Sequence, residues 1–162
     1  KAEQELEEKI PEAKKSSLIK KLEKFPIIRN KYPNEAMPTD GKLFGIAKIE
    51  DGLIKIDEKV VSYEDVNFII TNKGELRLGF RHVFLANNSN IIAAGGIKID
   101  KGVIKKISNL SGHFKPLLKE ADNYPEIFDN LGIKLDKAWL RITYETSETI
   151  DGTKTIQRKI KN

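Results

Sequence analysis

The sequence predicts an α+β fold, with a twisted antiparallel sheet of hairpins that curls toward a partial barrel. Four turn signals separate short runs rich in Ile, Leu and Val, in several of which apolar and charged residues alternate. Helical spacing of apolar residues is confined to an N-terminal arm and to one region that begins near residue 116. At 162 residues the chain is long enough for one domain with a substantial core.

The N-terminal arm is predicted to be helical. Its apolar residues follow the i, i+4 and i+7 spacing of a helix face, at Leu6, Ile10, Leu18, Leu22 and Phe25. Pro11 interrupts the pattern, which indicates two short helices or one broken helix. A connector with three prolines follows, so we assign 1–40 to a helical arm and linker and 41–162 to the α+β domain.

Four residue pairs predict tight turns between strands. They are Asp51-Gly52, Lys73-Gly74, Lys101-Gly102 and Asp151-Gly152. Such pairs supply the positive φ angles that two-residue hairpin turns require. The strands are therefore predicted over residues 43–50, 53–58, 66–71, 75–80, 91–100, 103–108, 134–146 and 153–160.

A helical region is predicted between the sixth and seventh strands. Pro116 follows a polar residue and suits the first turn of a helix. An apolar face is formed by Leu117, Leu118, Ala121, Ile127, Phe128 and Leu131. Pro125 should divide the region into two helices.

Composition excludes several classes of site. The chain has no cysteine, which rules out disulfides, thiolate nucleophiles and cysteine-ligated metals. It lacks the HExxH, GxSxG, Walker A and GxGxxG patterns, so no metal or cofactor is expected. No run approaches the roughly 20 apolar residues of a membrane-spanning helix. The chain starts at Lys1 without an apolar signal segment, and we expect it to be part of a longer polypeptide.

Positive charge gathers in the C-terminal half. The net charge is +5, with six lysines in 98–119 and four basic residues, without an acid, in 152–162. This distribution is compatible with nucleic acid as a partner or substrate. The alternative is that lysine-rich strands face water and prevent edge-to-edge pairing.

The two histidines, His82 and His113, are the candidate proton carriers. An ordinary histidine pKa lies near neutrality, so a pair can act as acid and base without a metal. If strands 75–80 and 91–100 are neighbours joined by the loop 81–90, both rings emerge on one rim of the sheet. The loop 59–65, with the acids Glu58, Glu64 and Asp65, should reach the same rim.

The flanking residues add a potential anion site. Arg81 and Lys115 supply positive charge, and the Ser111-Gly112 backbone could present N–H groups to a phosphate. Gly95-Gly96 within a strand indicates a bulge or a close backbone approach. In the alternative interpretation Ser111 is only a cap and His113 only a hydrogen-bonded strut that fixes the turn.

Part of the sequence resembles a motif found in two groups of proteins. The segments concerned are 68–76, Arg81-His82-Val83-Phe84-Leu85-Ala86, Ala93-Ala94-Gly95, Gly102-Val103-Ile104 and 109–116, about 50 residues in all. Their "AAG…SGHxxP" portion resembles the C-terminal toxin domains of bacterial polymorphic and Rhs-type proteins. The same order is similar to the core of plant IQ-motif calmodulin-binding proteins. Val83, Gly96 and Phe114 depart from the pattern.

The resemblance to toxin domains implies a function outside the producing cell. The toxin group fits a cysteine-free basic fragment better than the plant group does. No IQ-type basic amphipathic helix is present, so calmodulin binding is not expected. We expect a secreted effector domain that acts in the cytoplasm of a target cell. An acidic immunity protein is its expected partner.

The leading hypothesis is a metal-independent ribonuclease. RNA cleavage by the 2′-hydroxyl needs a base, an acid and a group that stabilises the phosphorane charge. His82 and His113 could supply the first two, and Arg81 or Lys115 the third, with Ser111 or Tyr144 as auxiliary donors. The alternatives are a non-catalytic protein-binding module, in which the SGHFKP turn is architectural, and an NAD-consuming toxin.

Overall fold

The computed structural model describes residues 12–160, and the predicted helix positions Leu6, Ile10 and Pro11 lie outside this range. Its helices are α2 (Glu12–Leu22), α3 (His82–Ala86), α4 (Leu118–Ala121) and α5 (Tyr124–Asn130). Its strands are β1 (Lys42–Glu50), β2 (Leu53–Ile56), β3 (Lys59–Val60), β4 (Tyr63–Thr71), β5 (Leu76–Phe80), β6 (Ile91–Asp100), β7 (Val103–Ser108), β8 (Trp139–Glu145) and β9 (Thr153–Lys159).

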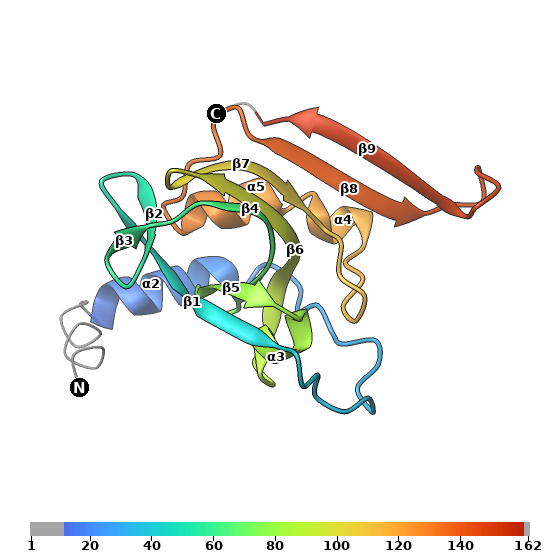
Figure 1. Ribbon diagram of the computed structural model, residues 1–162, viewed down its shortest axis with the longest axis horizontal. Helices are drawn as coiled ribbons and strands as arrows, with labels where there is room; N and C mark the ends of the chain where they lie inside the picture. The colour runs from blue at the N-terminus through green and yellow to red at the C-terminus, as the bar shows by residue number, and fades with distance from the viewer. Residues whose placement is uncertain (1–11, 161–162) are drawn as a thin grey trace.

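All of these strands belong to one strongly curved sheet (Figure 1). Their order is β3-β2-β1-β5-β4-β6-β7-β8-β9, and the pairing is antiparallel except between β7 and β8. The predicted α+β class and antiparallel hairpin sheet are therefore confirmed. The sheet is not a closed barrel, since β3 and β9 remain its two edges.

The turn signals form hairpins as the sequence predicts. Asp51 and Gly52 hold φ angles of 55° and 77°, and Lys101 and Gly102 hold 50° and 81°. Two successive residues with positive φ make the hairpin turn that matches the twist of antiparallel strands. The strands β1–β2 and β6–β7 consequently pair across these turns.

Three strand boundaries differ from the prediction. The predicted strand 53–58 ends already at Ile56, because Asp57 and Glu58 hold positive φ and turn the chain into β3. β4 starts three residues earlier than predicted, at Tyr63. β8 starts at Trp139 rather than near 134, after a turn in which Lys137 has a φ of 64°.

The predicted pairing of strands 75–80 and 91–100 is wrong. β4 lies between β5 and β6 and is hydrogen-bonded to both. Because β4 is antiparallel to each of them, β5 and β6 are parallel to one another, and parallel strands need a crossover rather than a hairpin. The segment 81–90 provides that crossover through α3, which packs against β4 and β5.

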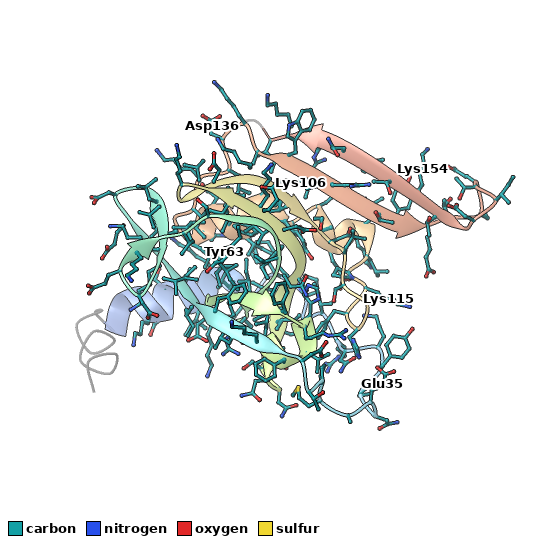
Figure 2. All side chains as sticks on the ribbon, in the orientation of Figure 1. Glu35, Tyr63, Lys106, Lys115, Asp136 and Lys154 are labelled. Atoms are coloured by element: carbon teal, nitrogen blue, oxygen red, sulfur yellow. The ribbon has the colours of Figure 1, made fainter. Side chains whose placement is uncertain are left out.

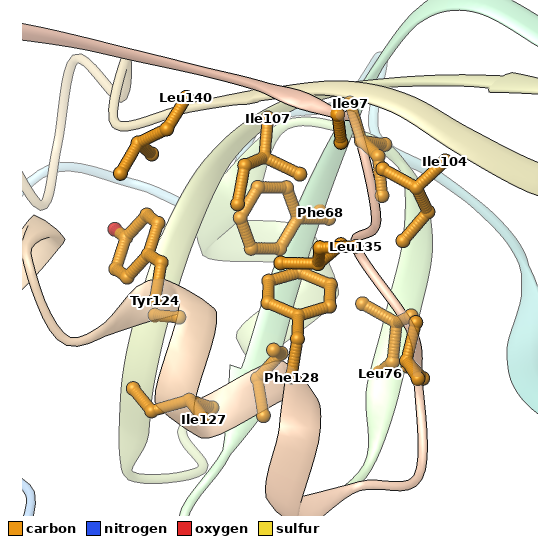
Figure 3. Packing of buried hydrophobic residues seen from close by; sticks show 14 of the residues in the cluster. Phe68, Leu76, Ile97, Ile104, Ile107, Tyr124, Ile127, Phe128, Leu135 and Leu140 are labelled. Carbon is orange, nitrogen blue, oxygen red and sulfur yellow. The ribbon is translucent and has the colours of Figure 1, made fainter. Parts of the chain in front are cut away.

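The main core fills the concave side of the sheet. α5 presents Tyr124, Ile127 and Phe128, each fully buried, toward Phe68 of β4 (Figure 3). The Phe68 and Phe128 rings meet edge to face at 5.5 Å. As predicted, Pro125 stands at the start of a separate helix, where its missing N–H leaves no hydrogen bond unmade.

A smaller cluster lies on the opposite face of the sheet. It joins α3 to β4 and β6 through Ile28, Ile69, Leu85, Ala86, Ile91, Ala94 and Phe114. Ile28 comes from the segment after α2, and its backbone N–H donates to the Ile91 carbonyl at 2.8 Å. The segment 23–41 is thereby held beside α3 and the 109–116 loop.

Within the described residues no helix is both long and apolar enough to cross a bilayer.

Candidate functional site

A pocket of about 610 Å³ lies between α3, the segment 32–38 and the 110–113 turn. Its lining mixes polar and apolar side chains and contains both histidines. The lining residues are Tyr32, Glu35, Pro38, Asn67, Arg81, His82, Val83, Leu110, Ser111, Gly112 and His113. His82 and His113 therefore line one pocket, as the sequence predicts. The pocket lies over a face of the sheet and not at its rim, and the α3 crossover brings His82 to it.

His82 forms the buried side of this pocket. The residue is only 8% exposed, and Nε2 lies 2.7 Å from the Gly95 carbonyl oxygen. Because a carbonyl can only accept, Nε2 carries the proton and Nδ1 keeps a lone pair. Burial lowers the pKa of His82 to about 4, with a smaller contribution in the same direction from the nearby His113. His82 is thus a neutral hydrogen-bond acceptor at pH 7.

His113 forms the accessible side of the pocket together with a carboxylate. Its Nε2 lies 2.6 Å from Glu35 Oε2, and the imidazole and carboxylate are respectively 27% and 58% exposed. The Lys31 backbone N–H donates to the His113 carbonyl at 2.6 Å, and the Tyr32 ring meets the imidazole edge to face at 5.8 Å. The backbone hydrogen bond and the contact with Tyr32 both fix the position of the His113 ring, whose Nε2 faces Glu35.

Arg81, which lines the pocket, forms an exposed ion pair with Asp40. The guanidinium donates to both carboxylate oxygens at 2.8 to 3.1 Å. These hydrogen bonds lower the pKa of Asp40 and raise that of Arg81. Arg81 itself has a φ of 70° and a ψ of 102°, a conformation that costs energy for any residue with a Cβ. Strain of this kind is typical of functional sites.

Lys115 adds a second cation at the other side of His113. Its ammonium donates to the Tyr32 hydroxyl at 2.7 Å, and this hydrogen bond raises the pKa of Lys115. Like Arg81, Lys115 has a positive φ, here 40°. The ammonium is exposed and makes no ion pair with a carboxylate among residues 12–160.

The predicted site residues are brought together only in part. Arg81, His82, Ser111 and His113 line the pocket, and Lys115 is linked to it through Tyr32. Tyr144 is not among the lining residues and lies on β8, opposite Lys154 of β9.

The acidic residues that the sequence predicts at the site lie elsewhere. Glu58, Glu64 and Asp65 do not line the pocket, and Glu64 instead pairs with Lys98 at 3.0 Å. β4 starts at Tyr63, so Glu64 and Asp65 belong to this strand and not to a loop at the rim. The carboxylate that lines the pocket is Glu35, while Asp40 pairs with Arg81. Both come from the connector, whose three prolines indicate a turn-rich course but not the part of the protein against which it packs.

Several residues of the AAG and SGHxxP segments and the preceding His82 hold the local fold together. The β6–β7 ladder ends at Ile97 and Ile107, and the carbonyl of Gly95, which is paired with Phe68 of β4, accepts a hydrogen bond from His82 Nε2 at 2.7 Å. A Cβ on Gly95 would stand 1.6 Å from the Ser108 carbonyl oxygen, so only glycine fits. Ser111 Oγ accepts from the Phe114 N–H at 3.3 Å and closes the turn.

No group of three or more His, Asp or Glu side chains suited to a metal occurs in the described part of the chain. The pocket offers other chemistry. It combines a neutral imidazole acceptor, an imidazole paired with a carboxylate, and cations that can meet an anion. Comparison of the chain with protein-family models, curated proteins and solved structures finds no match.

Proposed function

We propose that this pocket is the active site of a metal-independent ribonuclease. The observation that carries the proposal is the pairing of two imidazoles in opposite situations within one pocket. His82 is buried and neutral, whereas His113 contacts a carboxylate at 2.6 Å. Histidine and carboxylate side chains are the groups that general acid–base catalysis uses most often.

Glu35 and His113 carry the protons in this mechanism. Glu35 takes the proton of the ribose 2′-hydroxyl, and the oxygen attacks phosphorus to form a 2′,3′-cyclic phosphate. The bond from phosphorus to the 5′-oxygen breaks, and protonated His113 gives its proton to the leaving oxygen. The proton on Glu35 then passes to His113 across their shared hydrogen bond, which restores both groups.

The substrate has to enter between these two side chains. Base and acid act on opposite sides of the phosphorus during in-line displacement, so the hydrogen bond between Glu35 and His113 must open. Glu35 lies on the loop after Ile28 and its carboxylate is more than half exposed, which leaves it free to move aside.

The remaining groups position and stabilise the reacting phosphate. The lone pair of His82 Nδ1 accepts a hydrogen bond from the substrate, since its low pKa keeps this nitrogen unprotonated at pH 7. Arg81 and Lys115 balance the charge that grows on the phosphoryl oxygens in the transition state. The Ser111 hydroxyl is an additional donor.

We further propose that this activity belongs to a toxin or effector domain of a larger secreted bacterial protein, which acts in the cytoplasm of a target cell. The support is the AAG…SGHxxP resemblance together with a basic chain that has no cysteine. An acidic immunity protein is the proposed partner, because opposite charge speeds association.

Incubation of the purified protein with single-stranded RNA in EDTA tests the mechanism. Cleavage should give products that end in a 2′,3′-cyclic phosphate. Glu35→Gln and His113→Gln should each slow it by about 10²- to 10⁴-fold, the usual contribution of a general acid or base. Glu148→Gln is the matched control, because Glu148 is an exposed carboxylate paired with Lys154 and lies outside the pocket.

Intact RNA after incubation with the wild-type protein would contradict the proposal, and so would equal rates for the wild type and the two pocket variants. Expression in bacterial cells gives the corresponding test of toxicity. Growth arrest by the wild type but not by folded His113→Gln is the expected result.

A second candidate function has its own supporting observation. Gly95, Ser111 and His82 all make contacts that fix the polypeptide, which suits a protein-binding module whose SGHFKP turn is purely architectural. In that case the His113→Gln protein would keep its toxicity and the RNA would remain whole.

A further inference from the structure

A row of side chains crosses four neighbouring strands on the face of the sheet that carries the pocket. The register aligns Lys98 of β6 with Lys106 of β7, Lys106 with Trp139 of β8, and Trp139 with Lys159 of β9. Directly paired residues point to the same face of a sheet. These four side chains, called the basic strip below, therefore stand side by side over about 14 Å.

The strip is continuous with the candidate active site. Asn67, which lines the pocket, pairs with Gly96, and Gly96 precedes Lys98 by two residues on β6. Residues two apart on a strand share a face and lie about 7 Å from each other. Lys98, the first residue of the basic strip, thus lies about 7 Å from Gly96, the strand partner of the pocket residue Asn67.

The strip combines accessible positive charge with an exposed aromatic ring. Trp139 is 40% exposed, and the Lys159 ammonium lies 5.5 Å from its ring centroid. Within residues 12–160, Lys106 and Lys159 make no ion pair with a carboxylate, whereas Lys98 is paired with Glu64. Arg141 stands exposed on the same face, two residues after Trp139. Figure 2 marks Lys106 on β7 and, at the outer end of the β8–β9 hairpin, Lys154.

We propose that the basic strip binds single-stranded RNA and leads it into the pocket. This inference rests on the proposed ribonuclease function and defines the class of its substrate. Phosphates would lie against Lys106, Lys159 and Arg141, and an unpaired base would stack on Trp139. Stacking on an aromatic ring needs a base released from its partner, so the strip favours single strands over duplexes.

Fluorescence anisotropy with a labelled RNA of about 12 nucleotides measures this binding directly. The His113→Gln background prevents cleavage during the measurement. Trp139→Ala should weaken binding about 5- to 150-fold, the range expected when one base no longer stacks. Trp139→Phe keeps an aromatic ring and should restore most of the affinity.

Removal of two cations should change the salt dependence. In Lys106→Gln/Lys159→Gln the slope of log affinity against log salt should fall by about 1.4, or about 0.7 for each phosphate that the protein no longer neutralises. Lys154→Gln is the matched control, because Lys154 is an exposed lysine of β9 on the opposite face from Lys159. It should bind RNA like the parent protein.

The outcomes separate this inference from the ribonuclease proposal. If the strip variants bind as tightly as Lys154→Gln, or if duplex RNA binds as well as the single strand, the inference is wrong even when the wild type cleaves RNA. If the variants bind RNA more weakly but no protein cleaves it, the strip is an RNA-binding surface and the ribonuclease proposal fails. Where cleavage occurs, the strip variants should raise KM and leave kcat unchanged.

Discussion

Single residues at the pocket serve the fold and the chemistry together. His82 Nε2 donates to the Gly95 carbonyl, and the same bond keeps the proton on Nε2 and leaves Nδ1 as a hydrogen-bond acceptor. Gly95 allows the Ser108 backbone to approach within the space that a Cβ would occupy. The AAG element is thus in contact both with His82 and with the Ser108 backbone.

The low pKa of His82 predicts a pH-dependent stability. Its folded pKa is about 4 and its unfolded pKa about 6.5, so the unfolded chain binds more protons between these values. The contribution is complete above pH 6.5 and is lost as the pH falls toward 4, by about 3 kcal/mol in all. Urea unfolding of the wild type and of His82→Leu at several pH values should show the difference between their stabilities changing by this amount in that window.

The His113→Gln variant is the control for this measurement, since it keeps His82 buried. It should retain most of the pH dependence of the wild type, because burial is the main cause of the low pKa of His82 and His113 makes the smaller contribution. A difference between the wild type and His82→Leu that stays constant from pH 7 to pH 4 would show that His82 is not held neutral by the fold.

A second prediction concerns the close approach at Gly95. Gly95→Ala should destabilise the protein by about 3 kcal/mol or more, because the new methyl group overlaps the Ser108 backbone. Gly112→Ala is the control, since a Cβ there meets nothing within 4 Å and the residue does not hold a positive φ. Thermal unfolding of both variants is the measurement, and equal melting temperatures would contradict the packing described for β6 and β7.

Among the secondary-structure elements, hairpins follow the sequence closely and crossovers do not. The turn at Lys101-Gly102 is determined by two residues that accept positive φ, and strands joined by such a turn pair with each other. The insertion of β4 between β5 and β6 has no comparable local signal. It depends on the long, fully buried stretch at the end of β4, which satisfies hydrogen-bonding partners on both sides.

Helix α5 offers a test of the main core at this scale. Phe128 is fully buried against Phe68, so Phe128→Ala should cost about 3 to 5 kcal/mol of stability. Phe80→Ala removes the same group from a side chain that is 44% exposed and should cost much less. Denaturant unfolding compares the two, and similar decreases in stability would mean that α5 is not packed as described.

The whole molecule brings together parts of the site that are distant in the chain. Glu35 and Asp40 come from the segment after α2, Arg81 from the end of β5, and His113 from the loop after β7. Ile28 holds that segment against Ile91 on the outer face of the sheet. The smaller apolar cluster therefore supports the pocket, while the main core lies on the other face.

This division predicts that stability and activity respond differently to core substitutions. Ile28→Ala and Ile127→Ala each remove a buried side chain and should each cost about 2 to 5 kcal/mol. Only Ile28 anchors the segment that carries Glu35, so only its variant should lose RNA cleavage at a temperature where both proteins remain folded. Rates and unfolding curves measured on the same samples decide this, and equal activity of the two variants would contradict the role given to the segment.

The sequence by itself determined the fold class, the hairpin turns, the separate helix that carries Pro125 in its first turn and the candidate residues Arg81, His82, Ser111 and His113. Each of these depends on local chemistry: positive φ at Asp-Gly and Lys-Gly pairs, the missing N–H of proline, and the titration range of imidazole. Only the tertiary structure decided which carboxylate meets His113 and that His82 is neutral. Both depend on long-range packing, since Glu35 is 78 positions from His113 and the burial of His82 is produced by α3 crossing the sheet.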